Sequence, residues 1–182
     1  MQRFPLKHEA DAPKEVEQIY RDFQLGMGFP GVPNFIRVQG TSPRMLAGTW
    51  GLVKNILLEG NLPRSTKELI FVAIAVDREC NYCRDAHTAC CRILGVEDRT
   101  IRAVMEGLSE ELPDRIRNIL QFAVKCAAGP HELQDEDFAS LRQHGLDSEQ
   151  ILEVIATASM AVYAIIIADA TMLDTDAMFA SI

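Results

Sequence analysis

The sequence predicts a single all-α domain, and three observations support this prediction. Apolar residues recur at helical spacing along nearly all of the 182 residues. The few candidate strand segments lack the alternating pattern and the hairpin turns that strands usually carry. A chain of this length that is 48% apolar and 24% charged fits one domain with a sizeable core. We therefore expect one helical domain over residues 1–182.

The first half of the chain predicts an N-terminal helical extension, over about residues 1–31, followed by core helices. An amphipathic helix is expected over residues 13–27, and the turn-rich segment 28–34 ends it. Apolar residues at helical spacing predict a helix over residues 42–60, with Gly60 in the usual position after a helix C-terminus.

Another helix is expected to open at Ser65, and the later segments follow the same pattern. Asp147 and Gln150 form a plausible capping box at the start of the longest of these later helices. The remaining predicted helices cover residues 98–107, 113–128, 135–144 and 148–168, with a terminal piece through Phe179.

Charge and the N-terminal sequence narrow the class of protein. Nucleic-acid binders need clustered Lys and Arg to displace counterions, so a net charge of -8 and a pI near 5.0 argue against DNA or RNA as a partner. No apolar segment follows the basic residues near the N-terminus, so we expect no secretory signal and a cytoplasmic protein.

Two further features argue against a membrane protein and against a disulfide-stapled scaffold. The longest apolar stretch, residues 154–168, is shorter than the roughly 20 residues of a spanning helix, and we interpret it as a core or oligomer-interface helix. The cytosol keeps structural thiols reduced, so the five cysteines do not suggest a scaffold of disulfides. Any disulfide is expected to take part in chemistry.

The most informative motif is a CxxC, Cys80 to Cys83, with His87 four residues further on. On a helix that turns about 100° per residue, these three side chains lie within about 60° of one another. A helix N-terminus, a nearby cation and a CxxC each lower the pKa of a cysteine thiol, and this site combines them. His87 is placed to accept the proton of Cys83, and Cys80 is placed to form a disulfide with it.

Glu68 joins this site only if the chain reverses direction. A straight helix would hold Glu68 about 18 Å from Cys80, at 1.5 Å per residue. If the chain turns near residues 77–79, the helices before and after the turn pack antiparallel, and Glu68 can orient the His87 imidazole. The alternative is a capping box in which Glu68 returns a hydrogen bond to Ser65.

These residues resemble the AhpD-like alkylhydroperoxidase family of the carboxymuconolactone decarboxylase superfamily. The family pattern is a glutamate, a segment that leads to the first cysteine, and then CxxCxxxH, as in Glu68, Cys80, Cys83 and His87. The resemblance covers about residues 32–170 and implies an AhpD-like helical bundle with the CxxC at the N-terminal end of a core helix. It also implies a homo-oligomer, such as a trimer or hexamer.

The resemblance assigns a role to each site residue. The position of Cys83 is the thiol that reacts with peroxide, and that of Cys80 donates a proton and closes the disulfide. The positions of Glu68 and His87 form the proton relay. Decarboxylases of the superfamily generally lack the cysteine pair, so the CxxC favours redox chemistry.

The implied function is an antioxidant thiol peroxidase that reduces hydrogen peroxide or organic hydroperoxides and is reset by an external dithiol, such as a lipoyl or thioredoxin-like protein. One alternative is a disulfide reductase or adaptor that passes electrons from such a carrier to a peroxiredoxin. A second alternative is a redox sensor whose assembly changes on oxidation. The chain contains no GxGxxG, GxxxxGK[ST] or HExxH motif, so we expect neither a cofactor nor a metal.

The cysteines and histidines also have structural interpretations. A zinc site needs four ligands, usually as two spaced pairs, and no second CxxC or HxxxH accompanies Cys80 and Cys83. A thioredoxin-like motif belongs beside a βαβ pattern, which this chain lacks. Packing roles are predicted for Cys90, Cys91, Cys126 and Tyr82, and no role is predicted for His8, His131 and His144.

Overall fold

The computed structural model describes residues 3–182, and all regular elements within this range are helical, which confirms the all-α prediction. Residues 1 and 2 lie outside the described range. They belong to both the predicted N-terminal extension and the predicted single domain. The α-helices are α1 (Lys14–Met27), α2 (Asn34–Gln39), α3 (Pro43–Leu52), α4 (Arg64–Asp77), α5 (Asn81–Ile93), α6 (Asp98–Met105), α7 (Asp114–Ala128), α8 (Asp135–Gln143) and α9 (Ser148–Thr171). Short helical turns cover η1 (Glu9–Asp11), η2 (Val53–Leu58), η3 (Pro130–Glu132) and η4 (Ala177–Ser181).

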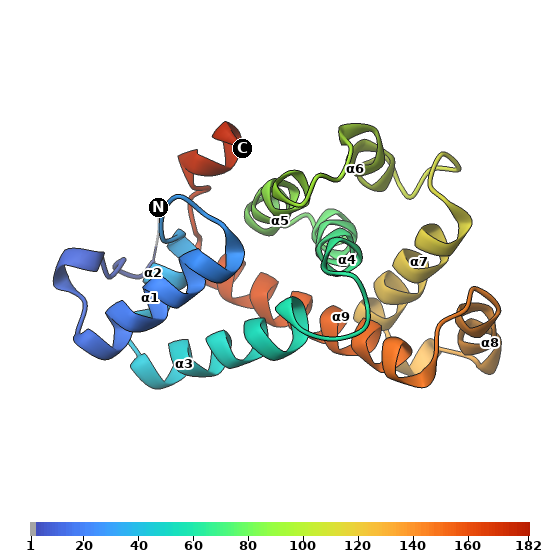
Figure 1. Ribbon diagram of the computed structural model, residues 1–182, viewed down its shortest axis with the longest axis horizontal. Coiled ribbons are helices and arrows are strands. Elements are labelled where there is room, and N and C mark those ends of the chain that lie inside the picture. The colour runs from blue at the N-terminus through green and yellow to red at the C-terminus, as the bar shows by residue number, and fades with distance from the viewer. Residues whose placement is uncertain (1–2) are drawn as a thin grey trace.

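Helix α4 forms the centre of the molecule. It packs against α5, α7 and α9, and the residues from Thr66 to Ala75 are all buried. Figure 1 shows α4 and α5 end-on in the middle, with α9 running beneath them, α1 to α3 on one side and α7 and α8 on the other. A functional group on the α4–α5 contact therefore lies within the core rather than on the surface.

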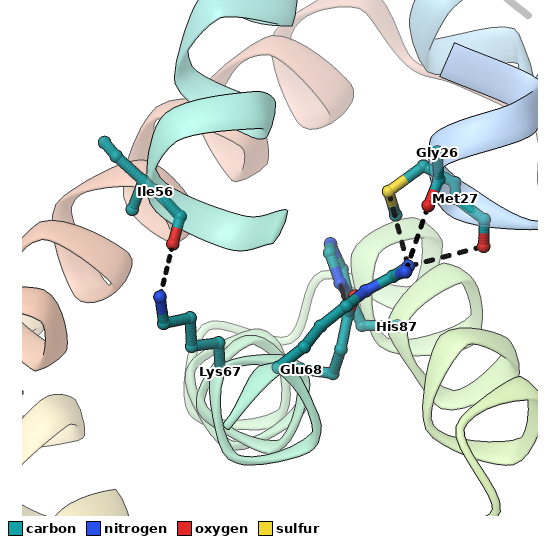
Figure 2. A network of polar contacts seen from close by, with 7 residues as sticks. Gly26, Met27, Ile56, Lys67, Glu68 and His87 are labelled. Carbon is teal, nitrogen blue, oxygen red and sulfur yellow. Dashed lines mark hydrogen bonds and ion pairs between the residues drawn. The ribbon is translucent and has the colours of Figure 1, made fainter. Parts of the chain in front are cut away.

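The predicted helix over residues 42–60 forms, but it changes geometry along its length. Its first part is α3, and its second part, η2, is a π-helix with wider turns. The ammonium of Lys67 lies under the end of η2, where it donates hydrogen bonds to the carbonyl oxygens of Ile56 (2.8 Å) and Glu59 (2.6 Å). Figure 2 shows the first of these bonds. Lys67 is fully buried, so these carbonyls help to replace its lost hydration.

A carboxylate completes the surroundings of Lys67. Glu153 on α9 lies 2.6 Å from the Lys67 ammonium and accepts hydrogen bonds from the backbone N–H groups of Asn61 (2.7 Å) and Leu62 (3.0 Å). Gly60 has φ 114°, and a side chain there would lie 2.5 Å from a Glu153 carboxylate oxygen. Gly60 therefore permits both the turn after η2 and the close approach of Glu153.

Helix α9 extends beyond the apolar stretch that the sequence singles out. The predicted capping box is confirmed, since Asp147 and Gln150 exchange hydrogen bonds at its start. With 24 residues, α9 is long and apolar enough to cross a membrane by length and composition alone, and half of its most apolar window is buried in the fold. Burial against α4 and α7 identifies α9 as a core helix with one uncovered side.

Candidate active site

The chain reverses direction just before the cysteine pair, as the predicted turn requires. Helix α4 ends at Asp77, and Glu79 adopts a left-handed conformation with φ 57°. Cys80 then occupies the N-cap of α5, and Cys83 lies in its first turn. The CxxC is therefore at the N-terminal end of a core helix, as predicted.

Both thiols are buried, with Cys80 1% exposed and Cys83 2% exposed. A hydrogen bond to the Cys80 sulfur and, next, burial raise the pKa of the Cys83 thiol well above its usual value. The sequence led us to expect a lowered pKa from the helix N-terminus and the motif. In the reduced pair the opposite holds, because the hydrogen bond stabilises the protonated thiol and burial disfavours the thiolate. Cys83 thus needs a base to take its proton.

His87 lines the same cavity as Cys83, and a buried carboxylate orients its ring. Nδ1 of His87 lies 2.6 Å from Oε2 of Glu68, and the Glu68 side chain is fully buried. The His87 ring also stacks on Phe71, with 3.9 Å between ring centroids. The contact confirms the predicted juxtaposition of Glu68 and His87. A carboxylate on Nδ1 leaves Nε2 of the neutral ring free to accept a proton.

Arg64 holds the second oxygen of Glu68, a contact that no pattern in the sequence predicts. Its Nε donates to Oε1 of Glu68 at 3.1 Å, and its guanidinium also donates to the carbonyl oxygens of Gly26 (3.1 Å) and Met27 (3.3 Å). Figure 2 shows Glu68 and His87 side by side, with Gly26 and Met27 across from them. The positive charge offsets the cost of burying the Glu68 carboxylate.

The capping-box alternative for Glu68 is wrong. The N-cap of α4 is Pro63, so Ser65 lies inside the first turn. Both oxygens of Glu68 have partners on other side chains, namely Arg64 and His87. Glu68 therefore connects α4 with α5 instead of closing its own helix.

Cys83 borders an apolar cavity of about 50 Å³. Cys83, His87 and Cys90 line it from α5, and Cys80 is not among its lining residues. Of the two cysteines, Cys83 therefore lines the cavity and Cys80 does not. Aromatic and sulfur-containing side chains supply much of the remaining wall: Phe23, Met27, Phe29, Phe35, Phe71, Tyr82, Met160, Tyr163 and Phe179.

The C-terminal segment closes over this site through Tyr82, the aromatic residue between the two cysteines. The Tyr82 hydroxyl donates to Asp176 at 2.7 Å and accepts from the backbone N–H of Phe35 at 2.9 Å. Phe179 packs edge-on against the Tyr82 ring, with 5.9 Å between centroids. Burial and then the Asp176 charge raise the pKa of Tyr82 well above its usual value, so its hydroxyl stays protonated. The predicted packing role of Tyr82 is confirmed, and its hydrogen bonds add a second role.

The other cysteines are buried, in agreement with their predicted packing roles. Cys90 and Cys91 are 1% and 0% exposed, and Cys126 is 7% exposed. Cys90 in addition reaches the cavity, and desolvation followed by the Glu68 charge raises its pKa well above the usual value. The sequence predicts a packing role for Cys90 but does not indicate that the cavity extends to it.

Among residues 3–182, neither Cys80 nor Cys83 belongs to a group of three potential metal ligands, so the zinc alternative is not supported. Within residues 3–182, the one group of three potential metal ligands is Glu68, His87 and Cys90, whose ligand atoms lie within 4.8 Å of one another. Neither cysteine of the CxxC belongs to it. The Arg64 guanidinium on Glu68 opposes a further cation there. His8, His131 and His144 do not line the cavity.

Comparisons with known proteins agree with this geometry. Residues 43–109 match the model of the carboxymuconolactone decarboxylase family. An alkyl hydroperoxide reductase of Mycobacterium tuberculosis is 27% identical over 99 residues, which are 54% of this chain and 28% of that protein. The chain thus spans less than a third of the length of this relative.

Solved structures extend the similarity to nearly the whole fold. A peroxidase-related protein from Ralstonia eutropha, described as an alkylhydroperoxidase AhpD core, superposes with a TM-score of 0.89 at 26% identity, over 98% of this chain and 94% of that chain. The debrominase Bmp8, solved in complex with 2,3,4-tribromopyrrole, gives a TM-score of 0.83 at 23% identity, over 100% of this chain and 95% of that chain. At that identity the second similarity concerns the fold.

The fold and the site together define an all-helical protein with a buried cysteine pair and a histidine–carboxylate contact. The chain contains a domain of the carboxymuconolactone decarboxylase family, of the AhpD-like kind. Among the similar proteins above 25% identity, one is described as an alkyl hydroperoxide reductase and one as a peroxidase-related protein.

Proposed function

We propose that the chain is a thiol-dependent peroxidase that reduces hydrogen peroxide or small organic hydroperoxides through Cys83 and Cys80. The observation that carries the proposal is that Cys83 and His87 line one apolar cavity while Glu68 holds the His87 ring. A small apolar peroxide that enters this cavity meets a nucleophile and a base together.

The proposed reaction has three balanced steps. His87 takes the proton of Cys83, and the thiolate attacks one peroxide oxygen, so the O–O bond breaks and the leaving alkoxide or hydroxide takes that proton. Cys83 becomes a sulfenic acid. The Cys80 thiol then displaces this hydroxyl as water and forms the Cys80–Cys83 disulfide. An external dithiol reduces the disulfide and leaves as a disulfide itself.

Because the pKa of Cys83 is raised, the first step of the proposed reaction depends on His87 to remove the thiol proton. A thiol that stays protonated at neutral pH reacts slowly with peroxide, because the thiolate is the nucleophile. Glu68 stabilises the imidazolium that forms when His87 accepts the proton. Arg64 donates a hydrogen bond to the other oxygen of Glu68, so the carboxylate lies between two positively charged groups at this stage.

Burial of the pair favours peroxidase activity over the adaptor alternative. Cys80 and Cys83 are each at most 2% exposed, so a folded protein disulfide cannot reach either sulfur without movement of the walls. A small peroxide or a slender lipoyl-like arm meets less obstruction. Rapid thiol exchange with a protein disulfide, together with absent peroxide turnover, would favour the adaptor.

We also propose a cytoplasmic homo-oligomer, a trimer or hexamer, that associates through the uncovered side of α9. Leu152 and Ile166 on this helix are 63% and 60% exposed, and large apolar surfaces often mark subunit contacts. Light scattering that gives a monomer would remove this part of the proposal. A large change of mass on oxidation would instead favour the redox-sensor alternative.

The test of the function is hydroperoxide consumption with a small dithiol as reductant. Cys83→Ser should abolish turnover, and Cys126→Ser, which changes a cysteine outside the cavity lining, should retain it. Unchanged turnover in Cys83→Ser would exclude the proposed mechanism.

A further inference from the structure

The cavity has a polar patch on the side formed by α3 and α9. Thr49 on α3 and Tyr163 on α9 both line it, and their hydroxyl oxygens lie 2.7 Å apart. Gln39 on α2 lies behind them, where its Oε1 accepts a hydrogen bond from Thr49 at 2.5 Å. Three helices therefore contribute to one chain of hydrogen bonds at an otherwise apolar wall.

The direction of this chain is fixed by its buried end. The Gln39 amide nitrogen donates to the carbonyl oxygen of Phe35 at 2.8 Å, so the amide oxygen must face Thr49. Thr49 has one hydroxyl hydrogen, and it is used on Gln39. Tyr163 must therefore donate its own hydrogen to Thr49. The hydroxyl hydrogens of Thr49 and Tyr163 are therefore both used within the chain.

The hydroxyl oxygens of Thr49 and Tyr163 can still accept hydrogen bonds from a ligand in the cavity. The Tyr163 oxygen keeps a free acceptor position, and a threonine hydroxyl accepts up to two hydrogen bonds, of which Tyr163 supplies one. A ligand carbonyl or carboxylate would be repelled by the oxygen lone pairs there, whereas a ligand O–H or N–H could donate a hydrogen bond to them. The lining also contains no Lys or Arg, which disfavours anionic ligands.

We propose that Thr49 and Tyr163 select the substrate: a neutral, apolar compound with one hydrogen-bond donor that the Tyr163 hydroxyl oxygen accepts. This inference rests on the proposed peroxidase function and specifies its substrate class. The class contains neutral organic hydroperoxides, which carry an O–H, and excludes hydroperoxides with a carboxylate. Gln39 acts as a positioning residue, because it sets the direction of the hydrogen bonds without lining the cavity.

Binding of unreactive probes to the reduced, full-length protein tests this selection. Phenol and toluene have nearly the same size, so both require the same expansion of the cavity. Only phenol carries a hydrogen-bond donor. In NMR titrations, Tyr163→Phe should weaken phenol binding about fivefold and leave toluene binding within about twofold. Ser159→Ala removes an exposed hydroxyl one turn earlier on α9 and should change neither affinity.

A second variant reverses the preference. In Thr49→Val, the Tyr163 hydroxyl loses its acceptor and is free to donate into the cavity. Benzonitrile, a flat probe that only accepts hydrogen bonds, should then bind about fivefold more tightly than to the wild type.

Equal losses of phenol and toluene binding in Tyr163→Phe, no gain of benzonitrile binding in Thr49→Val, or no binding of either aromatic probe to the wild type would overturn the inference. None of these probes is turned over. The inference can therefore fail while peroxide consumption is found, and the proposed function can fail while the selection is found.

Discussion

Nδ1 of His87 lies 2.6 Å from Oε2 of Glu68, although 19 residues separate them in the sequence. Arg64 holds the other carboxylate oxygen, so a cation, a carboxylate and an imidazole stand in line inside the core. In this order Glu68 holds the His87 ring in place, and the Arg64 charge lies beside the buried Glu68 carboxylate.

Removal of the Glu68 charge should slow peroxide reduction without unfolding the protein. We expect Glu68→Gln and His87→Asn each to lower kcat/KM for a hydroperoxide by about 100-fold or more, the scale of general-base catalysis. Asp85→Asn is the control, because Asp85 also lies on α5 but pairs with Arg84 at the surface. Turnover within twofold of the wild type in Glu68→Gln would show that the contact is only structural.

The hydrogen bond between the two cysteines should hold the reactive thiol in its protonated form. This bond is the largest cause of the raised pKa of Cys83, so Cys80→Ala should lower that pKa. At neutral pH a larger thiolate fraction follows, and iodoacetamide should alkylate Cys83 faster than in the wild type. Mass spectrometry resolves the site, and Cys126→Ala serves as the control. Slower alkylation of Cys83 in Cys80→Ala would contradict this reading of the pair.

The C-terminal segment should limit access to Cys83 through the Tyr82–Asp176 hydrogen bond. Tyr82→Phe removes the donor to Asp176 and the acceptor for the Phe35 N–H, at a cost of about 1–3 kcal/mol. We expect thiol reagents to modify Cys83 several-fold faster as the segment opens.

A matched substitution separates this local effect from lost stability. Tyr20→Phe also removes a hydroxyl from a buried tyrosine, one that donates to the carbonyl of Lys7 and does not line the cavity. It should leave Cys83 modification unchanged. Equal acceleration by both variants would point to global loosening rather than to the Tyr82 contact.

The pair of buried Lys67 and half-buried Glu153 should support stability in a pH-dependent manner. Burial pushes the Glu153 pKa upward, but hydrogen bonds from Lys67, Asn61 and Leu62 outweigh it and lower the pKa below its usual value. In the unfolded chain a glutamate has a pKa of about 4.3. Because the pKa of Glu153 is lower in the folded protein, the ionised carboxylate stabilises the fold above that pH, and this contribution is lost as the pH falls through the folded pKa. The wild type should therefore lose stability below about pH 5.

Urea unfolding measures this contribution directly. Glu153→Gln should cost about 3 kcal/mol at pH 7, because it leaves the Lys67 charge buried without its partner. Its stability should also depend less on pH between about pH 5 and pH 3 than that of the wild type. Glu149→Gln, an exposed change on the same helix, should stay within about 0.5 kcal/mol. Parallel pH curves for wild type and Glu153→Gln would be incompatible with the assigned role.

The sequence predicted the parts of the site that depend on local geometry. Cys80, Cys83 and His87 belong to one short stretch at the start of α5, so helical spacing alone brought them to one face. Placement of Glu68 required a chain reversal that no glycine marks, since Glu79 supplies the left-handed residue. The family pattern supplied what the local sequence could not.

Other contacts left no signal in the sequence because their partners are far apart or unusual. Arg64 hydrogen-bonds the carbonyls of Gly26 and Met27 across 38 and 37 residues. Tyr82 meets Asp176 across 94 residues. Lys67 is fully buried, although lysines rarely are, and no periodicity distinguishes such a lysine from a surface one. These features arise from packing between helices rather than from the order within one.

The most direct test of the central claim is mass spectrometry of the thiols before and after one equivalent of hydroperoxide. We predict a Cys80–Cys83 disulfide in the wild type, a trapped sulfenic acid on Cys83 in Cys80→Ser, and free thiols at Cys90, Cys91 and Cys126. Cys83 cannot pair with Cys90, because seven residues of helix separate their Cα atoms by about 10 Å. Unreacted thiols at Cys80 and Cys83 in the wild type, or oxidation that begins at Cys80, would contradict this claim.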